Sequence, residues 1–99
     1  MNKHIETLVQ RYPQLEICQD DILKAYQILE EAYSAGRKLL VAGNGGSASD
    51  SEHIVGELMK EFKLKRKIYA AQIDRLMKID AEMGTVLADH LQGTLPAIS

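Results

Sequence analysis

The sequence predicts an α/β fold in which a short parallel strand leads through a glycine turn into a helix. Residues 39–42 form an unbroken apolar run, which is typical of a parallel strand covered on both faces. Gly43, Gly45 and Gly46 follow directly, and glycine permits positive φ angles and close approach of a ligand to the backbone. Apolar residues then recur at helical spacing, at Ile54, Val55, Leu58, Met59 and Phe62. We therefore expect a strand at 38–43 and a helix over 48–61.

The predicted start of this helix is suited to binding an anion. Ser49 is followed three residues later by Glu52, which is the spacing of a capping box. Free N–H groups and the positive end of the helix dipole favour a phosphate at such a position. The hydroxyls of Ser47 and Ser49 are expected within reach of that phosphate.

Spacing discriminates among three kinds of phosphate loop. Gly43-x-Gly45-x-x-Ala48 fits the dinucleotide-binding fingerprint, but a charged run follows the helix where that fold requires the next strand. A nucleoside triphosphate loop is excluded because no Gly-Lys-Ser/Thr stands at the required distance. The remaining interpretation is a small phosphorylated ligand.

Two helices are expected before the strand, in residues 1–36. Apolar residues at helical spacing in residues 1–12 are interrupted by Pro13, and a second stripe runs from Leu15 to Gly36. Tyr26 and Tyr33 lie seven residues apart on that stripe. We interpret them as core residues rather than as a pair that stacks on a ligand.

A cationic run and two further helical pieces are expected after the glycine-turn helix. Five cations occupy eight positions: Lys60, Lys63, Lys65, Arg66 and Lys67. We favour a solvated helix end, where cations complement the dipole, over a site that attracts phosphate. Residues 68–92 are expected to form two helical pieces with Gly84 between them. Residues 95–99 are expected to form a second strand that pairs in parallel with the first.

Composition limits the class of protein. The chain has 99 residues, of which 45% are hydrophobic and 26% charged, so it holds one compact soluble domain at most. A formal charge of -2 gives no electrostatic reason to bind nucleic acid or an anionic membrane, so neither partner is expected. The single Cys18 forms no internal disulfide, and no apolar run approaches membrane-span length. We expect a cytoplasmic protein.

The segment Gly43-Asn-Gly-Gly-Ser-Ala-Ser-Asp-Ser-Glu-His53-Ile-Val-Gly-Glu57-Leu58 resembles the start of the sugar-isomerase (SIS) domain of phosphoheptose isomerases. The resemblance combines the G-N-G-G-S turn, an acid three residues after the serine, and a His-x-x-x-Glu pair. It implies a doubly wound parallel sheet and a homotetramer. The chain would then be a single incomplete SIS domain, made of N-terminal helices (1–36), strand, turn and helix (37–62), a helical insertion (63–93) and a second strand (94–99).

The resemblance also implies an activity, the conversion of sedoheptulose 7-phosphate to a heptose 7-phosphate. Its implied substrate-binding residues are Asn44, Gly45, Gly46, Ser47, Ser49 and Glu57. His53 and Glu57 are four residues apart and so share one helix face. Glu57 is the candidate base for an aldose-ketose isomerisation, and the same pair has the spacing of two zinc ligands. An ordinary surface pair is the third interpretation, and His4 and His90 are expected at the surface.

A second class of function remains open, a non-catalytic SIS module that binds a sugar phosphate or a protein. Glu57 favours the enzyme, because those relatives lack the acid at this position. Where the isomerases have an arginine after the Glu-Leu pair, this chain has Glu61, and Lys63 or Arg66 are candidates to replace it. The chain ends on its second strand, before a second phosphate loop and the later glutamine and histidine. We therefore expect residues 1–99 alone to be inactive.

Overall fold

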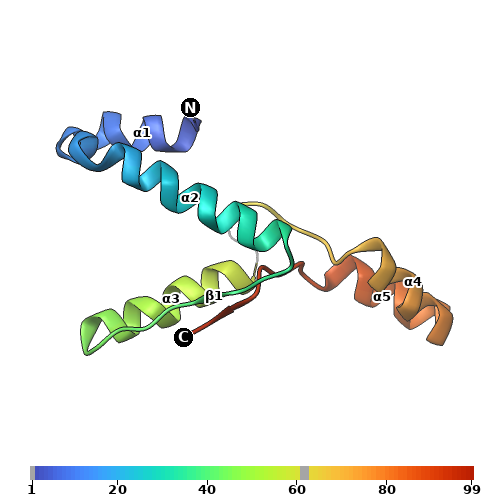
Figure 1. Cartoon of the computed structure of the whole chain (residues 1–99). Helices are drawn as coiled ribbons and strands as arrows, with labels where there is room; N and C mark the ends of the chain where they lie inside the picture. The colour runs from blue at the N-terminus through green and yellow to red at the C-terminus, as the bar shows by residue number, and fades with distance from the viewer. Residues whose placement is uncertain (1, 61–62) are drawn as a thin grey trace. The chain divides into compact units, whose positions relative to one another are not determined.

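The computed structural model describes residues 2–60 and 63–99, and the chain divides into two compact units. The first unit is Met1–Arg37 and the second is Lys38–Ser99, so the boundary falls between the predicted N-terminal helices and the predicted strand. Figure 1 labels the helices and strands of each unit. The predicted glycine turn and the His53 and Glu57 pair both belong to the second unit.

The first unit is helical, as the sequence predicts. Helix α1 (Lys3–Arg11) begins after Asn2, whose side chain accepts a hydrogen bond of 2.9 Å from the amide of His4. Proline then opens the short 3₁₀ helix η1 (Pro13–Cys18), which leads into α2 (Gln19–Ser34). The interruption at proline and the two helical stretches are thereby confirmed.

Helix α2 ends where Gly36 predicts its end. Gly36 has a φ of 71°, and the amide of Arg37 donates to the carbonyl of Ala32 at 2.8 Å, which together form a Schellman motif. Tyr26 is 41% exposed and its hydroxyl lies 3.4 Å from a carboxylate oxygen of Glu30. Within the first unit Tyr26 is therefore not enclosed, and the polar end of its ring faces a neighbouring acid on the same helix.

The second unit contains a two-stranded parallel sheet. Strand β1 (Leu39–Leu40) pairs with β2 (Ala97–Ile98), with Leu39 opposite Ala97 and Leu40 opposite Ile98. The amide of Val41 also donates to the carbonyl of Ile98 at 2.9 Å. The α/β class and the parallel pairing are confirmed, although both strands are shorter than the predicted 38–43 and 94–99.

Within the second unit, one face of this sheet is covered. Ala97 is buried at 5% exposure, and helix α3 (Gly46–Met59) packs against β2. The opposite face carries Leu40 and Ile98, which are 71% and 53% exposed. Within the second unit α3 supplies a layer on one side of the sheet, and burial of the strand on both faces stays a prediction.

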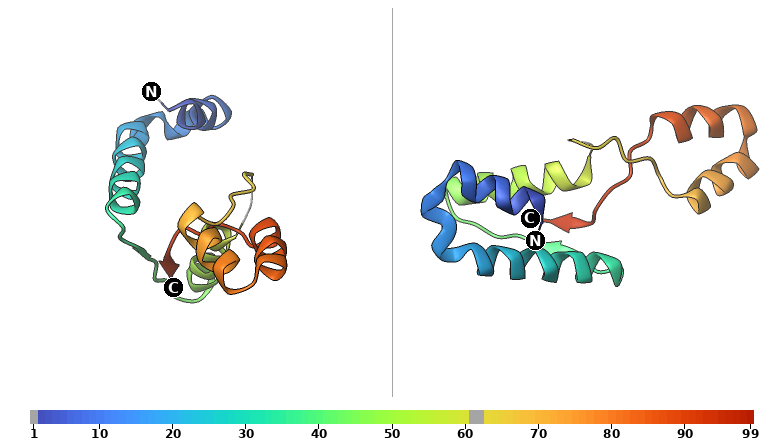
Figure 2. Two further views of the ribbon diagram at one scale, coloured as in Figure 1. Left: turned by 90° about the vertical axis from the view of Figure 1, so that its right-hand side faces the viewer. Right: turned by 90° about the horizontal axis from the view of Figure 1, so that it is seen from above.

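The remaining elements form a helical hairpin (orange in Figure 1). Helices α4 (Ala70–Ile79) and α5 (Ala81–His90) pack side by side, which both views of Figure 2 show. The break between them lies at Asp80, whose side chain accepts a hydrogen bond from the amide of Met83 at 2.9 Å. Gly84 lies inside α5, so its predicted place between the two helices is wrong. A Cβ there would approach the backbone of Leu76 to 2.9 Å, and glycine lets the helices come close.

Few apolar side chains are fully buried in the described residues. Ile5, Ala88 and Ala97 are buried, whereas large hydrophobic residues such as Ile17 (94%) and Ile79 (83%) are exposed. Among the residues described, no helix has the length and apolar character needed to cross a bilayer.

Candidate functional site

The glycine turn joins β1 to α3 through a tight reversal at Gly45. Its φ of 58° and ψ of -119° suit the first central position of a type II′ turn, which glycine dominates. The amide of Ser47 closes this turn by donating to the carbonyl of Asn44 at 3.2 Å. The hydroxyl of Ser47 reinforces it, because it accepts from the amide of Asn44 at 2.8 Å and donates to its carbonyl at 2.9 Å.

Close packing of backbone requires glycine at the start of the turn. A Cβ on Gly43 would overlap the carbonyl group of Ser47 and approach the amide nitrogen of Ala48 to 2.6 Å. All of these are backbone atoms of the turn and of the first turn of α3, so they have no side-chain freedom with which to move aside. Gly43 therefore serves the internal geometry of the turn, whether or not a ligand is bound.

Helix α3 begins earlier than the capping box predicts. It starts at Gly46 with Gly45 as N-cap and has no side-chain cap, so Ser49 and Glu52 lie within its first two turns and are exposed. Ser47 closes the preceding turn instead. The helix ends at Met59 and Lys60 is extended, whereas the predicted end at 61 and Phe62 lie outside the described residues.

The predicted anion cradle, meaning the free backbone N–H groups at this helix start, is smaller than expected. The amides of Ser47 and Ala48 donate to the carbonyls of Asn44 and Gly45, each at 3.2 Å. Within the described parts of the chain, the amides of Gly45 and Gly46 have no protein acceptor. These two N–H groups, with the exposed side chains of Asn44 and Ser49, are the groups left to meet a phosphate. The Ser47 hydroxyl, which is also predicted to bind the ligand, forms hydrogen bonds within the turn.

His53 and Glu57 lie on one face of α3, as their spacing predicts. Nε2 of His53 is 3.3 Å from Oε1 of Glu57, and Nζ of Lys60 is 3.8 Å from the same oxygen. The Glu57 side chain is only 29% exposed, whereas that of His53 is 77% exposed. Oε2 of Glu57 is shielded from solvent and has no hydrogen-bond partner among the described residues. One carboxylate oxygen is thus anchored and the other is available to accept a proton.

The glycine turn and Glu57 lie toward opposite ends of α3. Gly46 and Glu57 are eleven positions apart on this continuous helix, which corresponds to a rise of about 16 Å. Helical side chains lean toward the N-terminus, so the Glu57 carboxylate lies closer to the turn than the backbone rise alone gives. The two predicted halves of the site are thus arranged along one helix.

The His53 and Glu57 pair supplies too few donors for zinc. A catalytic zinc ion needs about three protein ligands. Among the described residues, no group of three or more His, Cys, Asp or Glu side chains is arranged to hold a metal. The pair alone is therefore not a zinc site, and a zinc ion there requires donors from outside the described residues.

The cationic run after α3 is partly committed to structure. The guanidinium of Arg66 donates to the carbonyls of Leu58 at 3.0 Å and Lys60 at 3.3 Å. These contacts satisfy the end of α3, which agrees with the favoured interpretation of the run as a helix end. Arg66 is consequently not free to replace the arginine of the isomerases. Lys63 is exposed, and Glu61 lies outside the described residues.

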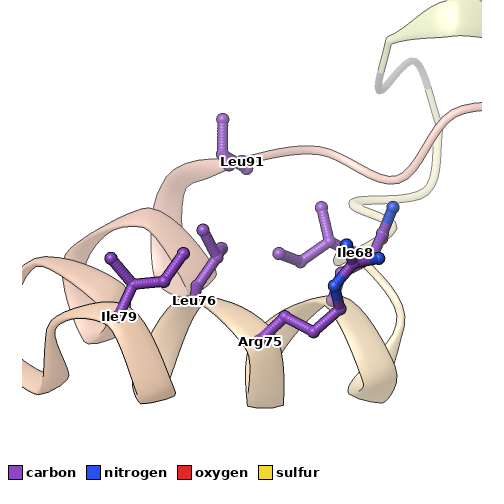
Figure 3. Close-up of a pocket in the computed structure, with 6 residues that line it drawn as sticks. Ile68, Arg75, Leu76, Ile79 and Leu91 are labelled. Atoms are coloured by element: carbon purple, nitrogen blue, oxygen red, sulfur yellow. The ribbon is translucent and has the colours of Figure 1, made fainter.

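A separate cavity of about 340 Å³ lies on the hairpin of α4 and α5 (Figure 3). Its walls are mostly aliphatic, with Arg75 as the one charged group, and its lining residues are Ile68, Gln72, Arg75, Leu76, Ile79 and Leu91. None of the predicted site residues contributes to it. This cavity had no signal in the sequence, because most of its residues belong to what read as the apolar faces of two ordinary helices.

Gly56, in the last two turns of α3, offers a stability test. Nothing lies within 4 Å of a Cβ built at this position, and glycine inside a helix costs about 1 kcal/mol relative to alanine. We expect Gly56→Ala to raise the free energy of unfolding by about 0.5–1 kcal/mol in urea titration. Gly84→Ala is the matched control and should destabilise, because its Cβ meets the backbone of α4. A destabilised Gly56→Ala would show that this position is crowded.

The second unit is an α/β unit with a glycine turn and a half-buried carboxylate on the following helix. Comparison with known proteins identifies the proteins to which this chain is similar. About half of the chain is similar to phosphoheptose isomerases. The match to that of Citrifermentans bemidjiense is 50% identical over 50 residues, which are 50% of this chain and 26% of the relative.

Two further phosphoheptose isomerases match in the same way. That of Clostridium acetobutylicum is 44% identical over 52% of this chain and 26% of its own length, and that of Campylobacter jejuni is 44% identical over 56% and 30%. The matched segment therefore spans about a quarter of the length of these relatives. No family model and no solved structure matches the chain. The resemblance inferred from the glycine turn is confirmed over this segment.

Proposed function

We propose that this chain forms part of a phosphosugar isomerase that interconverts sedoheptulose 7-phosphate and a heptose 7-phosphate. The observation that carries the proposal is Oε2 of Glu57, a carboxylate oxygen that is shielded from solvent and unpartnered in the described chain. Such a group in a native structure calls for a functional explanation, and proton abstraction supplies one. The names of the similar proteins support the same reaction.

Glu57 acts in this mechanism as the base that moves the proton between two carbons. Oε2 removes a proton from the carbon beside the carbonyl, the electron pair forms an enediolate, and the proton returns to the neighbouring carbon. The contact of His53 with Oε1 keeps Oε2 directed toward the substrate. The amides of Gly45 and Gly46 hold the phosphate of a substrate molecule. The acid that protonates the carbonyl oxygen comes from outside the described residues.

We propose further that the working site is assembled between copies of the chain. The rise of about 16 Å between Gly46 and Glu57 supports this, since the phosphate cradle of one copy can then serve the base of another. The proposed assembly is a homo-oligomer, with a tetramer as the form that the resemblance implies. The chain is then the N-terminal part of a doubly wound SIS domain, and any zinc ion held by His53 and Glu57 takes further donors from elsewhere. A cytoplasmic setting is supported by the single Cys18.

The experiment that tests the function is conversion of phosphorylated ketoses by the longest open reading frame that contains this chain. Sedoheptulose 7-phosphate should be consumed and a heptose 7-phosphate should appear in the ³¹P and ¹³C spectra. The 1–99 polypeptide is assayed beside it and should be inactive. Binding of the ketose phosphate without conversion by the longer protein would favour the non-catalytic SIS module.

Mixing two defective variants tests the shared site. Glu57→Gln removes the base and Gly43→Ala disrupts the cradle, so each homo-oligomer should be inactive. Because a mixed oligomer contains sites with one intact turn and one intact carboxylate, mixing should restore a fraction of the wild-type rate. Subunits are exchanged in mild denaturant and the rate is followed as the ratio varies. Failure to restore activity, with exchange verified by native mass spectrometry, would show that both groups act from one chain.

Gly45→Val is expected to weaken binding of sedoheptulose 7-phosphate by at least about ten-fold, which is 1.4 kcal/mol. The φ of 58° at Gly45 is strained for any residue with a Cβ, and the new side chain stands beside the free amides. Isothermal titration calorimetry measures the change, with Gly56→Ala as control because Gly56 lies outside the turn and its Cβ meets nothing within 4 Å. Equal affinity in a folded Gly45→Val protein would mean that the turn is only structural.

A further inference from the structure

We propose that Arg66 is a positioning residue, which keeps Glu57 in contact with His53 by fixing the last turn of α3. The importance of that contact rests on the proposed function, in which Glu57 is the base. The contacts of Arg66 themselves come from the geometry of the second unit and involve no ligand.

Arg66 joins three segments that are separate in the sequence. Its NH2 group donates to the carbonyls of Leu58 and Lys60 at 3.0 and 3.3 Å, and its Nε donates to the carbonyl of Gly93 at 3.5 Å. Its own carbonyl accepts from the amide of Gly93 at 2.6 Å. The carbonyl of Leu58 also accepts from the amide of Leu95 at 3.0 Å. The end of α3 is thereby tied to the chain on both sides of the α4 and α5 hairpin.

The last turn of α3 depends on such contacts. The last four carbonyls of a helix have no partner within it, and Gly56 lowers the helix propensity of this turn. Arg66 is half-buried, so its hydrogen bonds are less exposed to competition from water. A guanidinium reaches several carbonyls at once with a planar fork of donors, which the single ammonium of lysine does not match.

The effect reaches Glu57 through its neighbours on both sides. Glu57 immediately precedes Leu58, and Nζ of Lys60 contacts its Oε1 while the Lys60 carbonyl is held by Arg66. His53 lies one turn earlier, in the helix interior, and needs no help from Arg66 to stay ordered. If the last turn frays, Glu57 therefore leaves His53 and its shielded oxygen meets water.

The ring nitrogen shifts of His53, measured by ¹⁵N NMR on the full 1–99 chain, report this contact without any assay of activity. Glu57→Gln defines the shift of a His53 ring that has lost its carboxylate, and His53→Gln assigns the resonance. We expect Arg66→Gln to move the His53 shift most of the way to the Glu57→Gln value. Amide exchange in the last turn of α3 should speed up about ten-fold or more in the same variant. Lys65→Gln removes a neighbouring exposed cation and should change neither.

Arg66→Lys keeps the charge and the fold but loses the planar fork, and it should move the His53 shift in the same direction. Adding Gly56→Ala to Arg66→Lys should return the shift toward wild type, because it strengthens the turn by a different route. A wild-type His53 shift in Arg66→Lys together with faster amide exchange would overturn the proposal and leave Arg66 a purely structural residue. A lack of isomerase activity in every form would contradict the proposed function and leave the NMR result unchanged, so the two failures are distinguishable.

Discussion

Glu57→Gln is expected to lower kcat for sedoheptulose 7-phosphate by about 100-fold or more, with binding retained. Glutamine has nearly the same shape as glutamate and still meets His53, but its amide does not accept a proton from carbon. The shielded Oε2, which has no partner among the described residues, is the atom whose chemistry is lost. Steady-state kinetics and direct titration of the ketose phosphate measure the two effects separately.

Glu52→Gln serves as the control, because Glu52 is an exposed acid on the same helix. It should leave both kcat and binding unchanged. If the Glu57→Gln enzyme is active, Glu57 is not the base. The contact between His53 and Glu57 is then the ordinary surface contact that i,i+4 spacing commonly gives.

Gly43→Ala is expected to abolish measurable binding of sedoheptulose 7-phosphate, a loss of about 100-fold or more, which corresponds to about 2.7 kcal/mol. The added methyl overlaps the backbone of Ser47 and Ala48, so the turn must open and the free amides of Gly45 and Gly46 lose their shared direction. Calorimetric titration measures affinity, and circular dichroism verifies that the helices remain.

Gly46→Ala adds the same methyl three residues later, where nothing lies within 4 Å, and it should fold normally. Comparing the two alanine variants separates the steric demand of the turn from the general cost of replacing glycine. Normal affinity in Gly43→Ala would mean that the phosphate is bound elsewhere.

Much of the fold was accessible from local patterns. Pro13 and Gly36 mark helix boundaries through properties of a single residue, a missing amide and an accessible positive φ, and both boundaries stand in the structure. The parallel pairing followed from two apolar runs with helices between them. Burial of the strands on both faces stays a prediction, because an apolar run reports what a strand can pack against, and the second unit by itself covers one face of the sheet.

The site was accessible only in part. The shared face of His53 and Glu57 follows from helical periodicity alone, and the structure confirms it. The sequence did not predict which serine closes the turn. Ser47 and Ser49 were both candidates, and only the conformation of the turn places the Ser47 hydroxyl against Asn44. The role of Arg66 had no local signal, since its partners lie up to 27 residues away and are backbone carbonyls, which every residue possesses.

The glycines of the turn bear on how homologous sequences should be compared. At Gly43 and Gly45 every other L-amino acid meets a steric or torsional barrier. Invariant glycine at these positions would therefore reflect the geometry of the turn, even in a protein that had lost its ligand. Gly46 is different, because its φ is ordinary and open space surrounds the position of a Cβ. Drift to alanine or serine at position 46 is mechanically permitted. Glycine retained there across divergent lineages would therefore report selection by something that approaches the backbone from outside.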